Sequence, residues 1–183
     1  MMRCFWVNDN PLYIKYHDDE WGVASYDDRY LFEMLILESF QAGLSWECIL
    51  NKREAFRKAF DYFDYIKVAN YDDKKISELL NNKDIVRNKL KIMAAISNSK
   101  IFIKIQKEYG SFSNYIWSFT NNRQIVHSGT RVYTRNNLSD RISKDLKLRG
   151  MKFVGTVIIY SYLQAIGIID DHDSKCFKKM IVN

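Results

Sequence analysis

Hydrophobic residues recur along this chain mainly at intervals of three and four, the spacing that gives an α-helix one apolar face. The clearest stretch covers residues 27–42, where Leu31, Met34 and Leu35 fall on one stripe and Gly43 marks the end. Strict alternation of apolar and polar residues, the pattern of a half-buried strand, never continues beyond about four residues. The pattern therefore predicts an all-α fold.

Further helices are predicted from the same spacing, each beginning near a residue that favours an N-cap. They are a helix from Ser45 to about Phe60, a short one that starts at Asp72 or Asp73, a long one from Asp84 to about Lys107, one after Ser111, one from Ser139 to Gly150, and a last one from about Gly155 to Ala165. Residues 120–138 are polar and aperiodic, so we expect a mobile loop there.

The composition fits one compact unit. The 183 residues are 47% hydrophobic and contain no repeat and no Pro/Gly/Ser-rich linker, so we expect a single domain over residues 1–183. No apolar run has the length of a membrane-spanning helix, and the first residues lack the apolar core of a secretion signal. Three cysteines, at positions 4, 48 and 176, favour a reducing compartment over a disulfide framework. We therefore expect a cytoplasmic protein that does not contact membranes.

Cysteine and histidine residues form two pairs at opposite ends of the chain. Cys4 and His17 lie near the N-terminus, whereas His172 and Cys176 lie near the C-terminus. A spacing of four, as in the second pair, places two side chains on one face of a helix or turn, as a tetrahedral metal ion requires. Two thiolates and two imidazoles are a common structural zinc set with no open position for water. The alternative is two buried cysteines and two surface histidines.

A second constellation is a glycine-punctuated turn between two predicted helices. Gly150 and Gly155 favour a hairpin that buries Phe153 and Val154 and leaves backbone amides at the start of the second helix free to face a phosphate. The basic residues around this turn are Lys144, Lys147, Arg149 and Lys152. Together with a net charge of +6 and a pI of about 9.1, they fit gripping of a DNA backbone without reading of bases. The alternative is an ordinary helical hairpin with solvated lysines.

The third constellation is a carboxylate in an apolar stripe. Glu38 shares the inward face of the helix predicted over 27–42, and a buried carboxylate is costly unless it is paired or hydrogen-bonded. The usual explanation is an internal salt bridge, here with Arg53 or Arg87; the alternative is that Glu38 awaits a ligand. Aromatic residues from the same parts of the chain favour the ligand, because together they suit a flat cation. They are Trp6, Tyr13, Tyr16, Trp21 and Trp46.

Several stretches of the sequence match those of a known family. They are R-C-F-W at 3–6, P-L-Y at 11–13, Y-H-D-D-E-W-G at 16–22, Q-A-G-L-S-W at 41–46 and R-G-M-K-F-V-G at 149–155. With the three constellations, these stretches resemble the 3-methyladenine DNA glycosylase I family, a zinc-containing branch of the helix–hairpin–helix glycosylases. The resemblance spans nearly the whole chain and is weakest over about 60–135. The chain departs from the family at Asn10, where an aspartate is expected, and at Asp84, where a glycine is expected.

The resemblance implies roles for particular residues. One structural zinc ion would be held by Cys4, His17, His172 and Cys176. A flipped base would be bound by Glu38, Tyr16 and Trp46, with Trp6, Tyr13 and Trp21 completing the pocket, and the gap left in the DNA would lie near Gln41, Gly43 and Leu44. The backbone would be held at Gly150, Lys152 and Gly155. Since this family lacks the catalytic aspartate of many related glycosylases, Asp171 is interpreted as a partner of His172 or as a cap.

The resemblance also implies an activity: a monomeric, monofunctional glycosylase that removes 3-methyladenine from alkylated double-stranded DNA by base flipping, in base excision repair. Methylation at N3 makes the adenine cationic in DNA, so an ionised Glu38 and the face of Trp46 would favour it over neutral adenine. One alternative is a bifunctional glycosylase and lyase that uses Lys144, Lys147 or Lys152 for a Schiff base. Another is a non-enzymatic, zinc-stabilised DNA-binding module.

Overall fold

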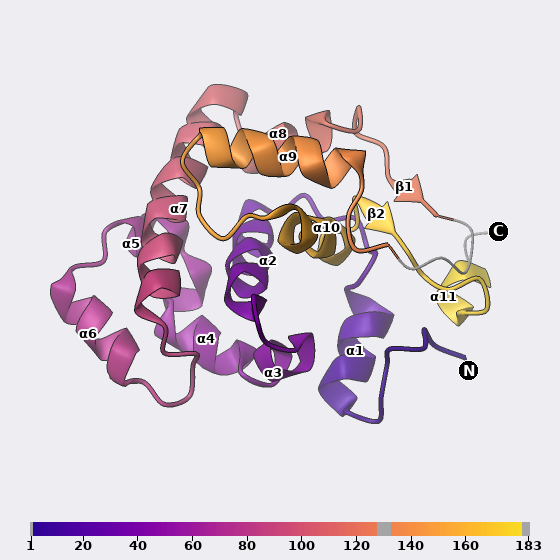
Figure 1. Ribbon diagram of the computed structural model, residues 1–183, viewed down its shortest axis with the longest axis horizontal. Coiled ribbons are helices and arrows are strands. Elements are labelled where there is room, and N and C mark those ends of the chain that lie inside the picture. The colour runs from indigo at the N-terminus through magenta and orange to yellow at the C-terminus, as the bar shows by residue number, and fades with distance from the viewer. Residues whose placement is uncertain (1, 128–132, 181–183) are drawn as a thin grey trace.

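A computed structural model of the chain, in which residues 2–127 and 133–180 are described, is built almost entirely of helices (Figure 1). These are α1 Pro11–Asp19, α2 Asp28–Gln41, α3 Trp46–Asn51, α4 Arg53–Ala59, the 3₁₀ turn η1 Asp61–Phe63, α5 Tyr65–Ala69, α6 Asp73–Asn81, α7 Lys89–Tyr109, α8 Phe112–Ser118, α9 Asn137–Leu148, α10 Thr156–Ala165 and α11 Phe177–Met180. Two short strands, β1 Ile125–Val126 and β2 Ile169–Asp170, pair in parallel. The predicted all-α fold is confirmed, with this small strand pair as the addition.

Helix α2 is the centre of the molecule and packs against α3, α7, α8 and α10 (Figure 1). Every residue from Leu31 to Phe40 is buried, so the single apolar stripe predicted from the sequence was too narrow a description. A helix that is covered on all sides carries its polar side chains into the interior as well. Glu33, Glu38 and Ser39 are buried in this way.

Several predicted helix boundaries were wrong because two candidate caps compete. The helix expected from Ser45 to Phe60 ends at Asn51 and restarts as α4 at Arg53. The long helix expected from Asp84 begins instead after Asn88, whose side chain accepts a hydrogen bond from the amide of Lys91. Likewise, the cap of α9 is Asn136 and not Ser139. Ser139 is the third residue of that helix and completes a reciprocal capping box with Asn136.

Two helices near the chain ends were not predicted. Helix α1 contributes only Tyr16 and His17 to the interior, too few buried positions to give a clear period. Helix α11 follows α10, which therefore is not the last helix. The predicted loop over 120–138 contains β1, and its residues 128–132 lie outside the described part of the chain.

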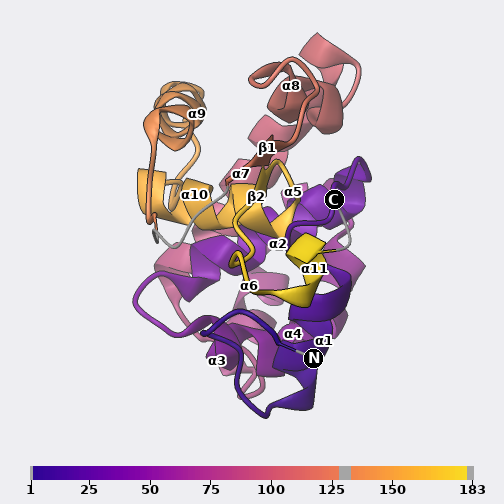
Figure 2. The ribbon, with the colours of Figure 1, turned by 90° about the vertical axis from the view of Figure 1, so that its right-hand side faces the viewer.

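The two ends of the chain meet on one side of the molecule, where α11 lies beside α1 (Figure 2). The amide of Phe177 donates to the carbonyl of Met2 at 2.9 Å, and the Nζ of Lys178 donates to the carbonyl of Asp18 at 2.8 Å. These contacts bring the two cysteine–histidine pairs together. In the described ranges, no helix has the length and apolar character needed to cross a bilayer.

Candidate active site and metal cluster

A cavity of about 290 Å³ opens between the N-terminal segment, α1, α2, α3 and α10. It is lined by Phe5, Trp6, Tyr13, Tyr16, Trp21, Glu38, Gln41, Trp46, Tyr133, Ser161 and Gln164. The sequence-predicted base-binding residues therefore all lie together around one cavity. Gln41 was predicted as a DNA-contacting residue, whereas Phe5, Tyr133, Ser161 and Gln164 were missed. The last two belong to α10, whose composition indicates only a core helix.

Glu38 is the buried acid of this cavity, with 3% of its surface exposed. The salt bridge proposed from the sequence is not formed. Arg53 is committed elsewhere, since its Nη1 donates to Glu20 at 2.7 Å and its Nε donates to Glu33 at 2.6 Å. Arg87 is exposed. Because Glu38 has lost its hydration, its pKa rises from 4.5 to about 8, so the carboxyl is mostly protonated at neutral pH.

The aromatic walls of the cavity meet at angles. Tyr16 and Trp46 lie 5.3 Å apart between ring centroids and are inclined by 50°, and Trp6 meets Trp21 edge to face at 5.0 Å. Among the described residues, the buried Nε1 of Trp46 has no hydrogen-bond partner. An N–H group in that position costs about 1–3 kcal/mol unless a ligand accepts its hydrogen bond. The wall thus offers ring faces to a ligand, and one of its residues carries a buried donor without a partner among the described residues.

A cluster of cysteine and histidine side chains joins the two ends of the chain beside Trp21. Ligand atoms of Cys4, His17 and Cys176 all lie within 4.8 Å of one another, and all three residues are buried. His172 is the fourth predicted member. Its ring meets that of His17 edge to face at 5.0 Å, and its buried Nε2 has no partner in the described chain. The cluster could hold a metal ion.

The electrostatics of the cluster fit this use. Burial lowers the pKa of His17 and so favours the neutral ring, which is the form that binds metals, whereas burial raises the pKa of the Cys4 thiol in the absence of a cation. The remaining ring nitrogens are oriented by carboxylates: His17 Nδ1 lies 2.7 Å from Asp18, and His172 Nδ1 lies 2.8 Å from Asp170.

The interpretation of Asp171 was therefore wrong, because its neighbour Asp170 is the partner of His172. Asp171 instead accepts hydrogen bonds from Tyr160 at 2.6 Å and from Gln164 at 2.7 Å, and it pairs with His127. Asp170 is the last residue of β2 and Asp171 follows it, and the sequence pattern does not distinguish these two adjacent aspartates.

Helices α9 and α10 form the predicted hairpin. Gly150 ends α9 with a φ of +98°, which a residue with a side chain adopts only under strain. Gly155 is the N-cap of α10 with an ordinary φ of −62°, and no side chain caps this end within the described chain. Val154 is buried as predicted, whereas Phe153 is only half-buried and has a φ of +55°.

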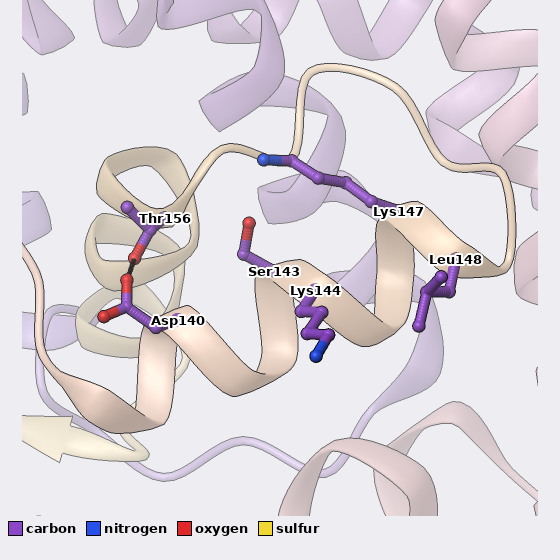
Figure 3. Close-up of a pocket in the computed structure, with 6 residues that line it drawn as sticks. All are labelled: Asp140, Ser143, Lys144, Lys147, Leu148 and Thr156. Atoms are coloured by element: carbon purple, nitrogen blue, oxygen red, sulfur yellow. Dashed lines mark hydrogen bonds between the residues drawn. The ribbon is translucent and has the colours of Figure 1, made fainter.

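A hollow of about 390 Å³ lies between the two helices of the hairpin, and Figure 3 shows the side chains that line it. It is lined by Asp140, Ser143, Lys144, Lys147, Leu148 and Thr156. Lys144, Lys147 and Lys152 are exposed, so they contribute positive charge as predicted. Arg149 does not, because it forms ion pairs with Glu108 at 2.6 Å and Asp145 at 2.7 Å.

The loop between α2 and α3 lies at the rim of the cavity. Gln41 lines the cavity itself, while Gly43 and Leu44 are exposed beside it. Gly43 has a φ of +82°, and a side chain added there would contact nothing within 4 Å. The residues predicted to face the gap in DNA are thus brought together with the predicted base-binding residues.

The geometry matches that of proteins already characterised. The chain is 44% identical to DNA-3-methyladenine glycosylase 1 of Escherichia coli (strain K12) over 179 residues, which cover 96% of each chain. The crystal structure of a 3-methyladenine DNA glycosylase I shares 44% identity and superposes with a TM-score of 0.93, covering 96% of this chain and 98% of that one. A variant of 3-methyladenine DNA glycosylase I, solved in complex with 3-methyladenine, is 37% identical, with a TM-score of 0.93 and 98% of both chains covered.

The fold is therefore one that DNA glycosylases share, with a hairpin of two helices beside a base-sized aromatic cavity. Residues 6–179 match the model of the methyladenine glycosylase family. The chain belongs to the methyladenine glycosylase family. The resemblance drawn from the sequence is confirmed.

Proposed function

We propose that this protein is a monofunctional glycosylase that hydrolyses the N-glycosidic bond of 3-methyladenine in alkylated double-stranded DNA. Family membership and the names of relatives at 44% identity support the activity. The observation that carries it to this chain is Glu38, a buried carboxyl without a cationic partner among the described residues, set in an aromatic cavity of about 290 Å³.

The chemistry follows from the state of the base. A base must leave the duplex stack before its glycosidic bond can be reached, and a damaged base costs least to extrude. Adenine methylated at N3 carries a positive charge in DNA, so its glycosidic bond is already weak and the base is a good leaving group. The enzyme then needs to hold the cation and exclude competitors more than it needs to activate a nucleophile.

Glu38 supplies the discrimination. A cationic base in the cavity would restore the charged form of the carboxyl, because an opposite charge nearby lowers a pKa that burial has raised to about 8. The face of Trp46 adds a cation–π contribution of about 0.5–2 kcal/mol, and its unpartnered Nε1 can donate to an acceptor on the ring. Trp6, Tyr13, Tyr16 and Trp21 complete the enclosure. Neutral adenine gains neither charge contribution.

We infer that one structural zinc ion is held by two thiolates and two imidazoles, from Cys4, His17, His172 and Cys176. The fit rests on the clustered ligand atoms of three of them and on the buried, unpartnered Nε2 of the fourth. When bound, zinc would join the two ends of the chain. It takes no part in bond cleavage.

DNA contact is assigned to two elements. The hairpin, with Gly150, Lys152 and Gly155, would hold phosphates through backbone amides, and Gln41, Gly43 and Leu44 would occupy the gap left by the flipped nucleotide. A lyase reaction would require a lysine activated in an apolar setting, whereas the lysines of the hairpin are exposed. We infer one domain over residues 1–183 that acts as a cytoplasmic monomer in base excision repair.

The direct test is incubation of the protein with methylated duplex DNA and identification of the released base. We expect free 3-methyladenine, intact abasic DNA and no covalent complex after borohydride reduction. Trp46→Ala should lose stacking on the base worth about 1–3 kcal/mol. DNA binding without release of any base would contradict the proposal and favour a non-enzymatic module, and a trapped covalent complex would favour a lyase.

A further inference from the structure

Helix α7 reaches both proposed DNA-contacting elements through buried polar side chains. The first is Lys91, which is only 7% exposed. Its Nζ donates to the carbonyl of Phe40 at 2.8 Å and to that of Ala42 at 2.6 Å. Burial lowers the pKa of this ammonium group, because a buried charge loses its hydration. The hydrogen bonds to the two carbonyls offset part of this free-energy cost.

The two carbonyls belong to the C-terminal end of α2, where backbone acceptors have no partner within the helix. The last turn of α2 contains no basic residue of its own. Lys91 therefore supplies the positive charge that a helix C-terminus favours, and it does so from another helix. It fixes the point at which α2 ends and the loop carrying Gly43 and Leu44 departs.

The second side chain is Asn98, which is fully buried. Its Nδ2 donates to the carbonyl of Lys152 at 2.8 Å, and its Oδ1 accepts from the amide of the same residue at 2.9 Å. The next residue, Phe153, has a φ of +55°, and the hydroxyl of Ser39 shares its one hydrogen between the carbonyl of Phe153 at 3.1 Å and that of Leu35 at 2.8 Å. This strained part of the hairpin is thus clamped from α7 and α2.

Lys91 and Asn98 are seven residues apart, which places them on the same face of α7 at a separation along the axis of about 10 Å. One face of α7 therefore contacts the C-terminal end of α2 through Lys91 and the turn of the hairpin through Asn98.

We propose that Lys91 and Asn98 are positioning residues for base excision, which hold the gap loop and the hairpin at a fixed separation on the DNA. The inference rests on the proposed function and extends it to a part of the chain that contacts neither the base nor the cavity. A displacement of about 1 Å in such an element is enough to slow a reaction by about a hundredfold.

Ser99 provides a matched control on the same helix. It is fully buried, and its hydroxyl donates to the carbonyl of Tyr65, so it ties α7 to α5 and not to either DNA element. Ser99→Ala should therefore lower stability by about 1 kcal/mol, as loss of one buried hydrogen bond does, without an effect specific to DNA.

The experiment compares Lys91→Met, Asn98→Leu and Ser99→Ala with the wild type in three assays. The first measures binding of free 3-methyladenine by quenching of tryptophan fluorescence, and the second measures affinity for an abasic duplex. The third measures single-turnover release of base from methylated duplex at saturating enzyme. We expect all three variants to bind the free base within about twofold of the wild type. Lys91→Met should slow release at saturation by about tenfold to a hundredfold, whereas Asn98→Leu should weaken duplex affinity by about tenfold. Lys91→Arg, which retains a cationic donor, should recover most of the rate.

Equal losses in free-base binding and in release, or the same loss of release in Ser99→Ala, would overturn the proposal. If Lys91→Met does not fold, amide hydrogen exchange is measured in Lys91→Arg and in the wild type instead. The Leu44 amide, which donates to the carbonyl of Gln41 at 2.7 Å, should be protected from exchange in both proteins. Rapid exchange there in the folded wild type would also overturn it. A wild type that releases no base would contradict the proposed function, while the duplex-affinity and exchange assays would still test the positioning roles.

Discussion

Replacement of Glu38 by glutamine should remove activity and at the same time stabilise the fold at neutral pH. The carboxyl has a pKa of about 8 in the folded protein and 4.5 when exposed, so between these values the folded state binds more protons than the unfolded state. The free energy of unfolding therefore falls as the pH rises from about 4.5 to 8. Glutamine keeps the shape and is neutral throughout, so Glu38→Gln does not share this loss.

The size of the effect follows from the pKa difference. Each pH unit in this window is worth about 1.4 kcal/mol, so between pH 5.5 and pH 7.5 the variant should gain about 2–3 kcal/mol relative to the wild type. At about 2–4 °C per kcal/mol for a chain of this size, the difference in melting temperature should widen by about 4–12 °C. The direction is opposite to that of most substitutions in a core, which destabilise.

The assay is thermal and denaturant unfolding of both proteins at several pH values, with release of 3-methyladenine measured alongside. Glu33→Gln is the matched control, because Glu33 is a buried acid of the same helix that accepts from Arg53 at 2.6 Å and from Arg57 at 2.9 Å. Its loss leaves a buried guanidinium with less compensation and should destabilise the protein. Unfolding curves of Glu38→Gln and wild type that stay parallel across the pH range would refute the reasoning.

Three further outcomes are expected. Cys176→Ala should lower the melting temperature and abolish stoichiometric zinc in metal analysis, and a wild type that purifies without metal in the absence of chelators would contradict this. Gly155→Val should cost only about 1 kcal/mol of stability, because a φ of −62° suits any residue and an added Cβ meets nothing within 4 Å, whereas valine is a poorer N-cap than glycine. It should weaken binding to all duplex sequences about equally, and a sequence-dependent loss would contradict phosphate contact. Asn10→Asp keeps the cap of α1 but loses the side-chain amide that donates to Glu47 at 2.9 Å. It should therefore destabilise the fold by about 1 kcal/mol in unfolding experiments, and an unchanged stability would contradict that role of Asn10.

The sequence predicts those helix boundaries that neighbouring residues determine, and it misses those that contacts with distant segments determine. Helix α2 was placed to within a residue at each end because a capping aspartate, a dense apolar run and a glycine agree there. The start of α7 was missed because Asp84 and Asn88 are both good caps, and the carbonyl of Asp84 accepts a hydrogen bond from Lys52 of a distant segment instead of one within a helix. A contact between elements distant along the chain has no local pattern.

The same distinction applies to the cavity. Aromatic residues of the N-terminal segment and of α3 could be predicted because they cluster in sequence around one inward acid. Gln164 could not, since it stands in a helix of strongly apolar composition and enters the cavity only through the packing of α10 against α2. The choice between a salt bridge and a ligand for Glu38 could not be made from the pattern either, because nothing local shows that Arg53 pairs with Glu20 and Glu33 instead.

Buried polar atoms without partners carry the most information about where this fold expects something further. Within the described residues these side-chain atoms are Trp46 Nε1, His172 Nε2 and Arg53 Nη2. Each would cost about 1–3 kcal/mol if nothing ever satisfied it, a large fraction of the net stability of a domain. Trp46 lines the cavity proposed for the base and His172 belongs to the proposed metal cluster, so a ligand that reaches either atom would recover that cost. The unliganded protein is less stable because these groups have no partner, and a ligand that satisfies them gains the same free energy as affinity. The same reasoning applies to Glu38, whose ionised form destabilises the unliganded protein and would be stabilised by a cationic base.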